Sequence, residues 1–217
     1  ADFLSHEATF GVGYGVVTFT AGKEDINRDF YSGELVRQNI EYQNRLNKED
    51  AYVRLARLSL ETYIKTRMVI KPNNDLPAEM FNTRAGCFVS LHANGQLRGC
   101  IGTIEATKSN LALEIIHNAI SASTQDPRFN PVTVNELTSL EISVDVLGKP
   151  ETIPDPSSLD VKRYGVIVSK GLRRGLLLPN LEGVDTIEQQ VNIAKQKAGL
   201  DLDEDCSYQR FEVVRHL

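Results

Sequence analysis

Residues 87–103 of the chain read CFVSLHANGQLRGCIGT, and this stretch predicts a tight β-hairpin. Asn94 and Gly95 tolerate the positive φ angles that a two-residue type I′ turn requires, so the pair is a strong hairpin signal. A turn at these two residues sets the register of the strands. The expected opposite pairs are Ala93–Gln96, Leu91–Arg98 and Val89–Cys100.

This register assigns the side chains of the hairpin to two faces, because successive residues of a strand point to opposite sides. Cys87 and Cys100 become diagonal neighbours on one face, roughly 7 Å apart at Cα. His92 falls on the other face, which argues against a Cys100–His92 catalytic dyad. Gly99 and Gly102 indicate a bulge or a close approach by a ligand or another backbone. The alternative is a buried cysteine in an ordinary hairpin whose glycines make room for a packed helix.

Three further segments accompany the hairpin motif LRGCIG at residues 97–102. They are DPRF at 126–129 followed by Pro131, RGLLLP at 174–179 and KAGL at 197–200. In order and spacing, the four segments resemble the AMMECR-type domain family, which is named for a syndrome of Alport nephropathy, midface hypoplasia, intellectual disability and elliptocytosis. The resemblance extends over about residues 48–215. It implies a compact α+β domain from a family whose biochemical activity is not established.

Bulk composition narrows the class of protein. The 217 residues carry a formal net charge of −5, which gives no global field favouring nucleic acid. Three cysteines argue against a disulfide framework and fit a reducing compartment. No run approaches the roughly 18 apolar residues of a membrane span, and no signal peptide is recognisable. We therefore expect a cytoplasmic protein without membrane contact.

Residues 1–30 are expected to lie outside the main domain. Tyr14–Phe19 predicts a β-strand with no evident partner, and residues 21–30 predict a linker. The strand resembles the last strand of LigB-like domains, the extradiol dioxygenase-like fold shared with Memo proteins. The resemblance implies that the chain is a C-terminal piece of a fusion. Its partners would be the upstream LigB/Memo-like domain of the same polypeptide and a radical-SAM protein.

A linker helix is expected over residues 31–46, and the AMMECR-type domain over residues 47–217. The hydrophobic periodicity of the domain predicts an α+β fold, with antiparallel β-sheets and packed helices in two strand–helix–strand-pair units. The expected elements are a helix from an Asn47 N-cap to Lys65, a helix from Ser109 to Gln125, a strand over Leu140–Val146, a second hairpin over residues 165–178, a helix capped by Asp185 and ended by Gly199, and a last strand over Tyr208–Val214.

Two cationic residues are candidates for binding an anion. Arg98 lies on the strand of Cys100, and it needs a partner because burying an unpaired charge costs about several kcal/mol. Either Asp126 or a bound anion could be that partner. Arg128 follows a predicted helix end, so we expect it to bond to the last helical carbonyls. The candidate substrate-binding residues are Arg98, Gly99, Gly102, Asp126 and Arg128.

Cys100 is the candidate catalytic residue. As a nucleophile it needs a positive field or a nearby base, and Arg98 supplies the first. His117 is the histidine left as a base, although a satisfied or exposed histidine is the alternative interpretation of that residue. The cysteines and histidines lack metal-ligand spacing, so no metal is expected. No phosphate-binding glycine loop precedes a helix, and we expect no cofactor.

Two functions remain open. The first is a component of an enzyme system with a cleft around Arg98, Cys100, Asp126 and Arg128 that accepts a small or polymeric anionic molecule. The second is a non-catalytic domain that docks onto, or delivers substrate to, the LigB-like domain.

Overall fold

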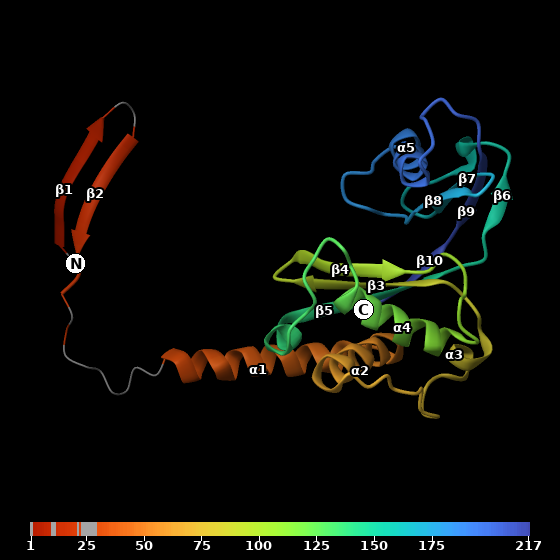
Figure 1. Ribbon diagram of the computed structural model, residues 1–217. Helices are drawn as coiled ribbons and strands as arrows, with labels where there is room; N and C mark the ends of the chain where they lie inside the picture. Colours follow the sequence, from red (N-terminus) through yellow and green to blue (C-terminus); the bar gives the residue numbers. More distant parts are fainter. Residues whose placement is uncertain (1, 10–11, 21, 23–29) are drawn as a thin grey trace. The chain divides into compact units, whose positions relative to one another are not determined.

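The computed structural model describes residues 2–9, 12–20, 22 and 30–217 (Figure 1). The chain divides into two units, residues 1–38 and residues 39–217. In the first unit, strands β1 (Asp2–Thr9) and β2 (Val12–Thr18) pair in antiparallel fashion. The strand expected over Tyr14–Phe19 is therefore present, but the expectation that it lacks a partner is wrong. Its partner is β1, and the expected linker at residues 21 and 23–29 lies outside the described residues.

Residues 39–217 form two antiparallel four-stranded sheets, each covered by helices on one face (Figure 1). The strand order is β10-β5-β3-β4 in the first sheet and β6-β9-β7-β8 in the second. The strands are β3 (Cys87–Ala93), β4 (Gln96–Gly102), β5 (Leu140–Leu147), β6 (Glu151–Ile153), β7 (Gly165–Lys170), β8 (Arg173–Leu177), β9 (Ser207–Phe211) and β10 (Val213–His216). The helices of the chain are α1 (Phe30–Lys48), α2 (Ala51–Thr66), α3 (Ala78–Asn82), α4 (Leu111–Thr124) and α5 (Ile187–Ala198), with short 3₁₀ helices η1 (Val134–Ser139) and η2 (Pro156–Ser158).

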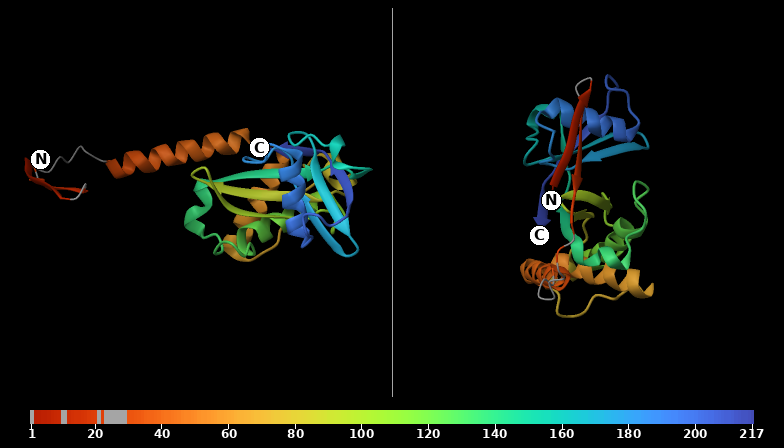
Figure 2. Two further views of the ribbon diagram at one scale, coloured as in Figure 1. Left: turned by 90° about the horizontal axis from the view of Figure 1, so that it is seen from above. Right: turned by 90° about the vertical axis from the view of Figure 1, so that its left-hand side faces the viewer.

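Three apolar clusters hold these layers together. The first lies between the first sheet and helices α2 and α4, and the second lies between the second sheet and α5. The third joins the two sheets, with Leu147, Ile167, Leu176 and Phe211 at its centre. The order of layers is therefore helix, sheet, sheet, helix, which Figure 2 shows from two further sides.

The helices begin at side-chain caps that the sequence analysis placed slightly too early. Helix α1 continues to Lys48, so Asn47 lies inside it and Asp50 caps α2 by accepting from two backbone N–H groups. Asn110, not Ser109, caps α4. Thr186, not Asp185, caps α5 and forms a capping box with a glutamine three residues on. Each correction has the same cause, which is that several residues near each helix start have cap chemistry.

The hairpin turn is confirmed, but the register beyond it is wrong. Asn94 and Gly95 have φ angles of 53° and 74° and form the turn between β3 and β4. The ladder then shifts, because Arg98 is an extra residue between Leu97, which pairs with His92, and Gly99, which pairs with Leu91. This β-bulge reverses the face of every later β4 residue. The remaining opposite pairs are Ser90–Cys100, Val89–Ile101 and Phe88–Gly102.

The last expected strand, Tyr208–Val214, is two strands in two different sheets. β9 pairs with β6 and β7 of the second sheet, whereas β10 pairs with β5 of the first. Glu212 lies between them, and its carbonyl accepts a hydrogen bond from the Gly148 N–H at 2.8 Å. The chain thus crosses between the sheets beside Phe211, which is fully buried in the cluster that joins them. No helix of the described residues is both long and apolar enough to span a membrane.

Deleting residues 1–29 tests whether the second unit depends on the first. Because residues 39–217 form their own unit, we expect the deletion to lower their free energy of unfolding by less than about 1 kcal/mol. Urea unfolding of both chains, followed by circular dichroism, measures this difference. A larger loss would show that the β1–β2 sheet is integral to the fold of residues 39–217.

Candidate functional site

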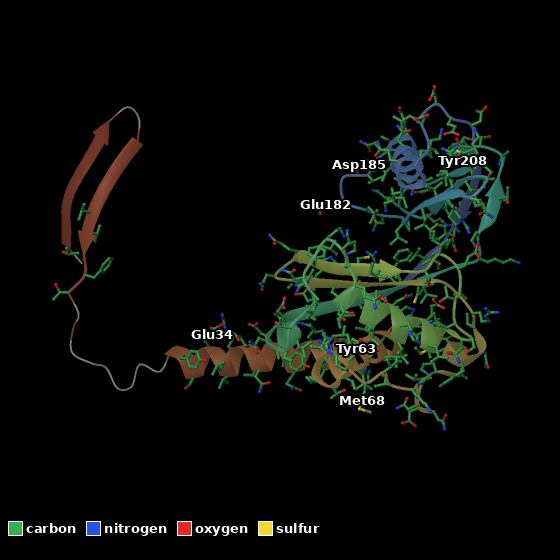
Figure 3. All side chains as sticks on the ribbon, in the orientation of Figure 1. Glu34, Tyr63, Met68, Glu182, Asp185 and Tyr208 are labelled. Atoms are coloured by element: carbon green, nitrogen blue, oxygen red, sulfur yellow. The ribbon has the colours of Figure 1, made fainter. Side chains whose placement is uncertain are left out.

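A cleft of about 760 Å³ opens between the two sheets of residues 39–217. The first sheet contributes Cys100 and its neighbours on β3, β4, β5 and β10 to the wall. The second sheet contributes residues 174–178 of β8 and the loop beyond it, and α5 contributes Lys197. Glu182, which is labelled in Figure 3, lies on that loop between β8 and α5. The segments 97–102, 126–129, 174–179 and 197–200, far apart in sequence, all contribute residues to this cleft.

Cys100 faces the cleft because of the bulge at Arg98. Its sulfur accepts a hydrogen bond from Ser90 Oγ at 3.2 Å, and both residues line the cleft wall. His92 lies on the same face and also lines the cleft. The prediction that His92 and Cys100 lie on opposite faces is therefore wrong. The prediction that Cys87 and Cys100 share one face is also wrong. Cys87 is fully buried in the cluster on the helix side of the sheet.

The backbone of Cys100 is held on both sides by an ion pair. Asp126 Oδ2 accepts from the Cys100 N–H at 2.9 Å, and Arg128 Nη2 donates to the Cys100 carbonyl at 3.3 Å. Arg128 and Asp126 bond to each other at 2.7 and 2.9 Å. Arg128 therefore does not bond to helical carbonyls as expected, since the nearby buried carboxylate is a stronger acceptor. The Arg128 guanidinium holds the pKa of Asp126 well below its usual range, against the opposing effect of burial, and the Cys100 N–H adds to the lowering.

Arg98 pairs with neither Asp126 nor a bound anion, the two partners that were expected. Its Nε donates to Glu136 Oε1 at 2.7 Å, and Glu136 is the residue through which the capping box of η1 is formed. This guanidinium lowers the pKa of Glu136 to about 2, although burial opposes the shift. Arg98 is not among the residues that line the cleft. The bulge turns it away, so the expected positive field at Cys100 has to come from other residues.

The two glycines of the motif have separate roles. A Cβ on Gly99 would lie 2.2 Å from the Ala122 carbonyl oxygen of α4, so this glycine allows the helix to approach the strand. Gly99 thus fits the alternative interpretation, in which the glycine makes room for a packed helix, better than it fits a role in substrate binding. Gly102 lines the cleft, but the ring of Phe88 occupies the space where its side chain would be. Gly102 therefore remains a candidate only through its backbone.

Four cations line the cleft, and sequence reasoning assigned one of them, Arg128, to the site. They are Arg174, Lys197 and Arg215, together with the predicted Arg128. Arg174 pairs with Glu105, and Arg215 forms two bonds with the buried carboxylate of Asp145. Arg174 and Lys197 belong to segments quoted above for the family resemblance, which was the available signal. Nothing in the sequence indicated that Arg215, on β10, reaches the same wall.

Lys197 differs from the other three cations. Among the residues that the structure describes, no carboxylate lies within ion-pair distance of its ammonium. Desolvation lowers the pKa of Lys197, and the positive charge of Arg128 lowers it further, while Cys100 acts in the opposite direction. The residue as a whole is exposed, and it lines the cleft. The side chain is thus a cation that interacts electrostatically with a thiol and with a second cation, and a bound anion beside it would be stabilised.

His117 does not reach the cleft wall. It lies on α4, the helix packed against the other face of the first sheet, and it is not a cleft-lining residue. Burial lowers the pKa of His117, and the charge of Lys108 adds to this effect. His117 is therefore not placed to act as a base for Cys100, whereas His92 lines the same cleft as the thiol. In the part of the chain that the structure describes, no cluster of three His, Cys, Asp or Glu side chains is arranged to hold a metal.

An Asp126→Asn substitution tests the clamp on the Cys100 backbone. It removes a charge that accepts from both Arg128 and the Cys100 N–H, and we expect a loss of about 1–3 kcal/mol in unfolding free energy at pH 7. A carboxyl whose folded pKa is depressed stabilises the fold above its unfolded pKa of about 3.9 and loses this effect as pH falls through the folded value. The difference between the two proteins should therefore shrink below about pH 4.

Urea unfolding across this pH range measures the effect, with Asp185→Asn at an exposed position as the control. The control should change stability by less than about 0.5 kcal/mol. A difference between wild type and Asp126→Asn that does not depend on pH would contradict the assigned role of the charge.

Alkylation distinguishes the faces of the two hairpin cysteines. Burial raises the pKa of Cys87 to about 12, and its side chain is inaccessible, so it should react with iodoacetamide only after unfolding. Cys100 lines the cleft and should react in the folded protein. Mass spectrometry of tryptic peptides measures both rates. Equal modification of the two residues in the folded state would contradict the observed register.

Comparison with known proteins agrees with the fold and leaves the chemistry open. A protein of Thermotoga maritima is 54% identical over 170 residues, which make up 77% of this chain and 98% of that protein. A protein of Clostridium acetobutylicum is 47% identical over 216 residues, which cover 99% of this chain but 46% of that protein. The chain thus spans about half the length of the Clostridium relative.

A solved structure has the same fold as this chain. The crystal structure of the uncharacterized protein PH0010 from Pyrococcus horikoshii matches with a TM-score of 0.69 and 37% identity, over 76% of this chain and 88% of that one. The predicted α+β fold with antiparallel sheets and packed helices is confirmed. Residues 53–216 match the AMMECR1 family, and the chain belongs to that family.

Proposed function

We propose that residues 39–217 form the ligand-binding component of an enzyme system, and that the cleft between the sheets holds a small anionic molecule beside Cys100. The observation that carries this proposal is Lys197, a partly desolvated cation with no carboxylate in ion-pair range among the described residues. The cleft also has more cations than carboxylates in its wall, with four against Asp145 and Glu182. A ligand carboxylate or phosphate would supply the missing counter-charge.

Arg128 supports the same conclusion from the opposite wall. Its Nε and Nη2 are used in the bonds to Asp126 and the Cys100 carbonyl. Among the described residues, Nη1 has no hydrogen-bond partner, so this donor is available to a ligand. The ion pair with Asp126 fixes the plane of the guanidinium, which reduces the entropy lost on binding. Lys197 and Arg128 interact electrostatically, so one anion between them would relieve their repulsion.

The apolar part of the cleft limits the ligand to one with a hydrophobic body. Leu176 of β8 and Phe88 of β3 line this space, together with Leu178 and Ile104, which follow the ends of β8 and β4. Binding pockets typically combine such apolar walls with a few polar groups that orient the ligand. We therefore propose a ligand that combines a carboxylate or phosphate with an apolar or planar body.

Calorimetric titration with inorganic phosphate and with terephthalate tests this function. We expect terephthalate to bind, because one of its two carboxylates and its ring match the two parts of the cleft. Lys197→Met, which keeps the length of the side chain but removes its charge, should weaken binding about tenfold or more, equivalent to about 1.4 kcal/mol. Lys162→Met, at an exposed lysine outside the cleft, is the matched control and should leave the affinity unchanged.

Two outcomes would overturn the proposal. One is the absence of binding by both probes, and the other is binding that Lys197→Met leaves unchanged. Binding of phosphate without terephthalate would remove the apolar part of the ligand from the proposal and keep the anion site.

The second candidate function is delivery of a ligand to a partner domain. It is favoured by the length of the Clostridium relative, which matches 99% of this chain and extends well beyond it. We propose a LigB/Memo-like domain as the additional part, on the resemblance of Tyr14–Phe19 to the last strand of such domains, with a radical-SAM protein as a further partner. Co-purification of the full-length relative with each partner, expressed together, tests this assignment.

A further inference from the structure

We infer that Cys100 is a nucleophile that accepts an acyl group from an anionic acyl donor, with His92 as the proton acceptor. The inference rests on the proposed anion site, because Lys197 and Arg128 hold the donor's charged group. It adds to that site a covalent reaction and a base.

The bulge at Arg98 puts three reactive side chains on one wall of the cleft. Ser90 lies directly opposite Cys100 in the ladder, and His92 is two residues further along β3 on the same face. Diagonal positions of an antiparallel pair are about 7–8 Å apart at Cα, within reach of a long side chain. Among the described residues, no protein group hydrogen-bonds to the His92 ring, so the ring is available to the Cys100 thiol directly or through one water.

One hydroxyl group and three cations interact with the sulfur. Ser90 Oγ donates to it at 3.2 Å, and it interacts electrostatically with Arg128, Lys197 and Arg215. A thiolate, rather than a thiol, is the attacking species, and nearby cations are the usual means by which proteins stabilise it. The hydrogen bonds of Asp126 and Arg128 to the Cys100 backbone also hold the sulfur in one position. Such restraint lowers the entropic cost of attack on a bound molecule.

Within this chain, a disulfide is not the chemistry of Cys100. Cys87 is buried on the other face of the same sheet, and Cys206 is not among the residues lining the cleft. Transfer of an acyl group needs no second thiol and no change of oxidation state. It requires a nucleophile, a proton acceptor and a site that orients the donor, and the cleft contains all three.

The proposed step balances without any further reagent. His92 takes the thiol proton while Cys100 Sγ forms a bond to the carbonyl carbon of the donor. The bond from that carbon to its leaving oxygen, nitrogen or sulfur breaks, and the leaving atom takes the proton from His92. The product is a thioester on Cys100, and water or a second acceptor then attacks the thioester carbon and restores the thiol.

The test compares two activated esters of similar shape. Mono-4-nitrophenyl terephthalate carries a carboxylate, and 4-nitrophenyl 4-methylbenzoate does not. Each rate of nitrophenolate release by the whole chain is divided by the rate with N-acetylcysteine, which removes the difference in intrinsic reactivity. We expect a burst of one nitrophenolate per chain from the anionic ester, about tenfold or more faster than from the neutral one, and an acyl group on the Cys100 peptide by mass spectrometry.

Variants assign the roles of the residues. Cys100→Ser should abolish the burst, and His92→Gln should slow it about 100-fold while terephthalate affinity stays within about twofold. Lys197→Met should remove the preference for the anionic ester. Cys206→Ser, at a thiol outside the cleft, should behave like wild type.

Failure of this inference is distinguishable from failure of the anion site. Terephthalate binding that depends on Lys197, without acylation of Cys100, would overturn the inference and leave the site intact. Absence of both would overturn the two together. Acylation of Cys206 or of lysines in place of Cys100, or equal normalised rates for the two esters, would also contradict it.

Discussion

The bulge at Arg98 determines which β4 side chains face the cleft between the two sheets. An extra residue in β4 shifts the ladder by one, so Cys100 faces the cleft while Gly99 faces helix α4. The ion pair of Arg98 with Glu136 holds the extra residue on the side away from the cleft. Without the bulge, Cys100 would take the face that now packs against α4, because a shift of one residue exchanges the faces of a strand.

The Asp126–Arg128 pair connects this bulge to the electrostatics of the cleft. Asp126 fixes the amide of Cys100, and Arg128 bonds to the Cys100 carbonyl and interacts electrostatically with Lys197. The carboxylate is buried while the guanidinium is about half exposed, so one end of the pair stabilises the fold and the other remains available. One ion pair thus links folding stability to the proposed anion site.

Much of the fold follows from local sequence patterns, and most of the site does not. The Asn94–Gly95 turn, the alternating strand from Leu140 and the Gly199 helix end all depend on residues within a few positions of each other. The bulged Arg98, in contrast, pairs with Glu136, which is 38 residues away along the chain. The short β4 sequence also lacks the alternation that would reveal a shift.

The crossing of the chain between the sheets at Glu212 is equally hidden, since Tyr208–Val214 has the pattern of one continuous strand. The cleft itself exists because the second sheet packs over the first, and no local pattern encodes that contact. The decisive measurement is a crystal structure of the protein alkylated with iodoacetate. The account predicts a carboxymethyl group on Cys100 in the cleft, with its carboxylate within hydrogen-bond distance of Lys197 or Arg128. A Cys100 sulfur buried against α4, or a carboxymethyl group directed away from both cations, would contradict it.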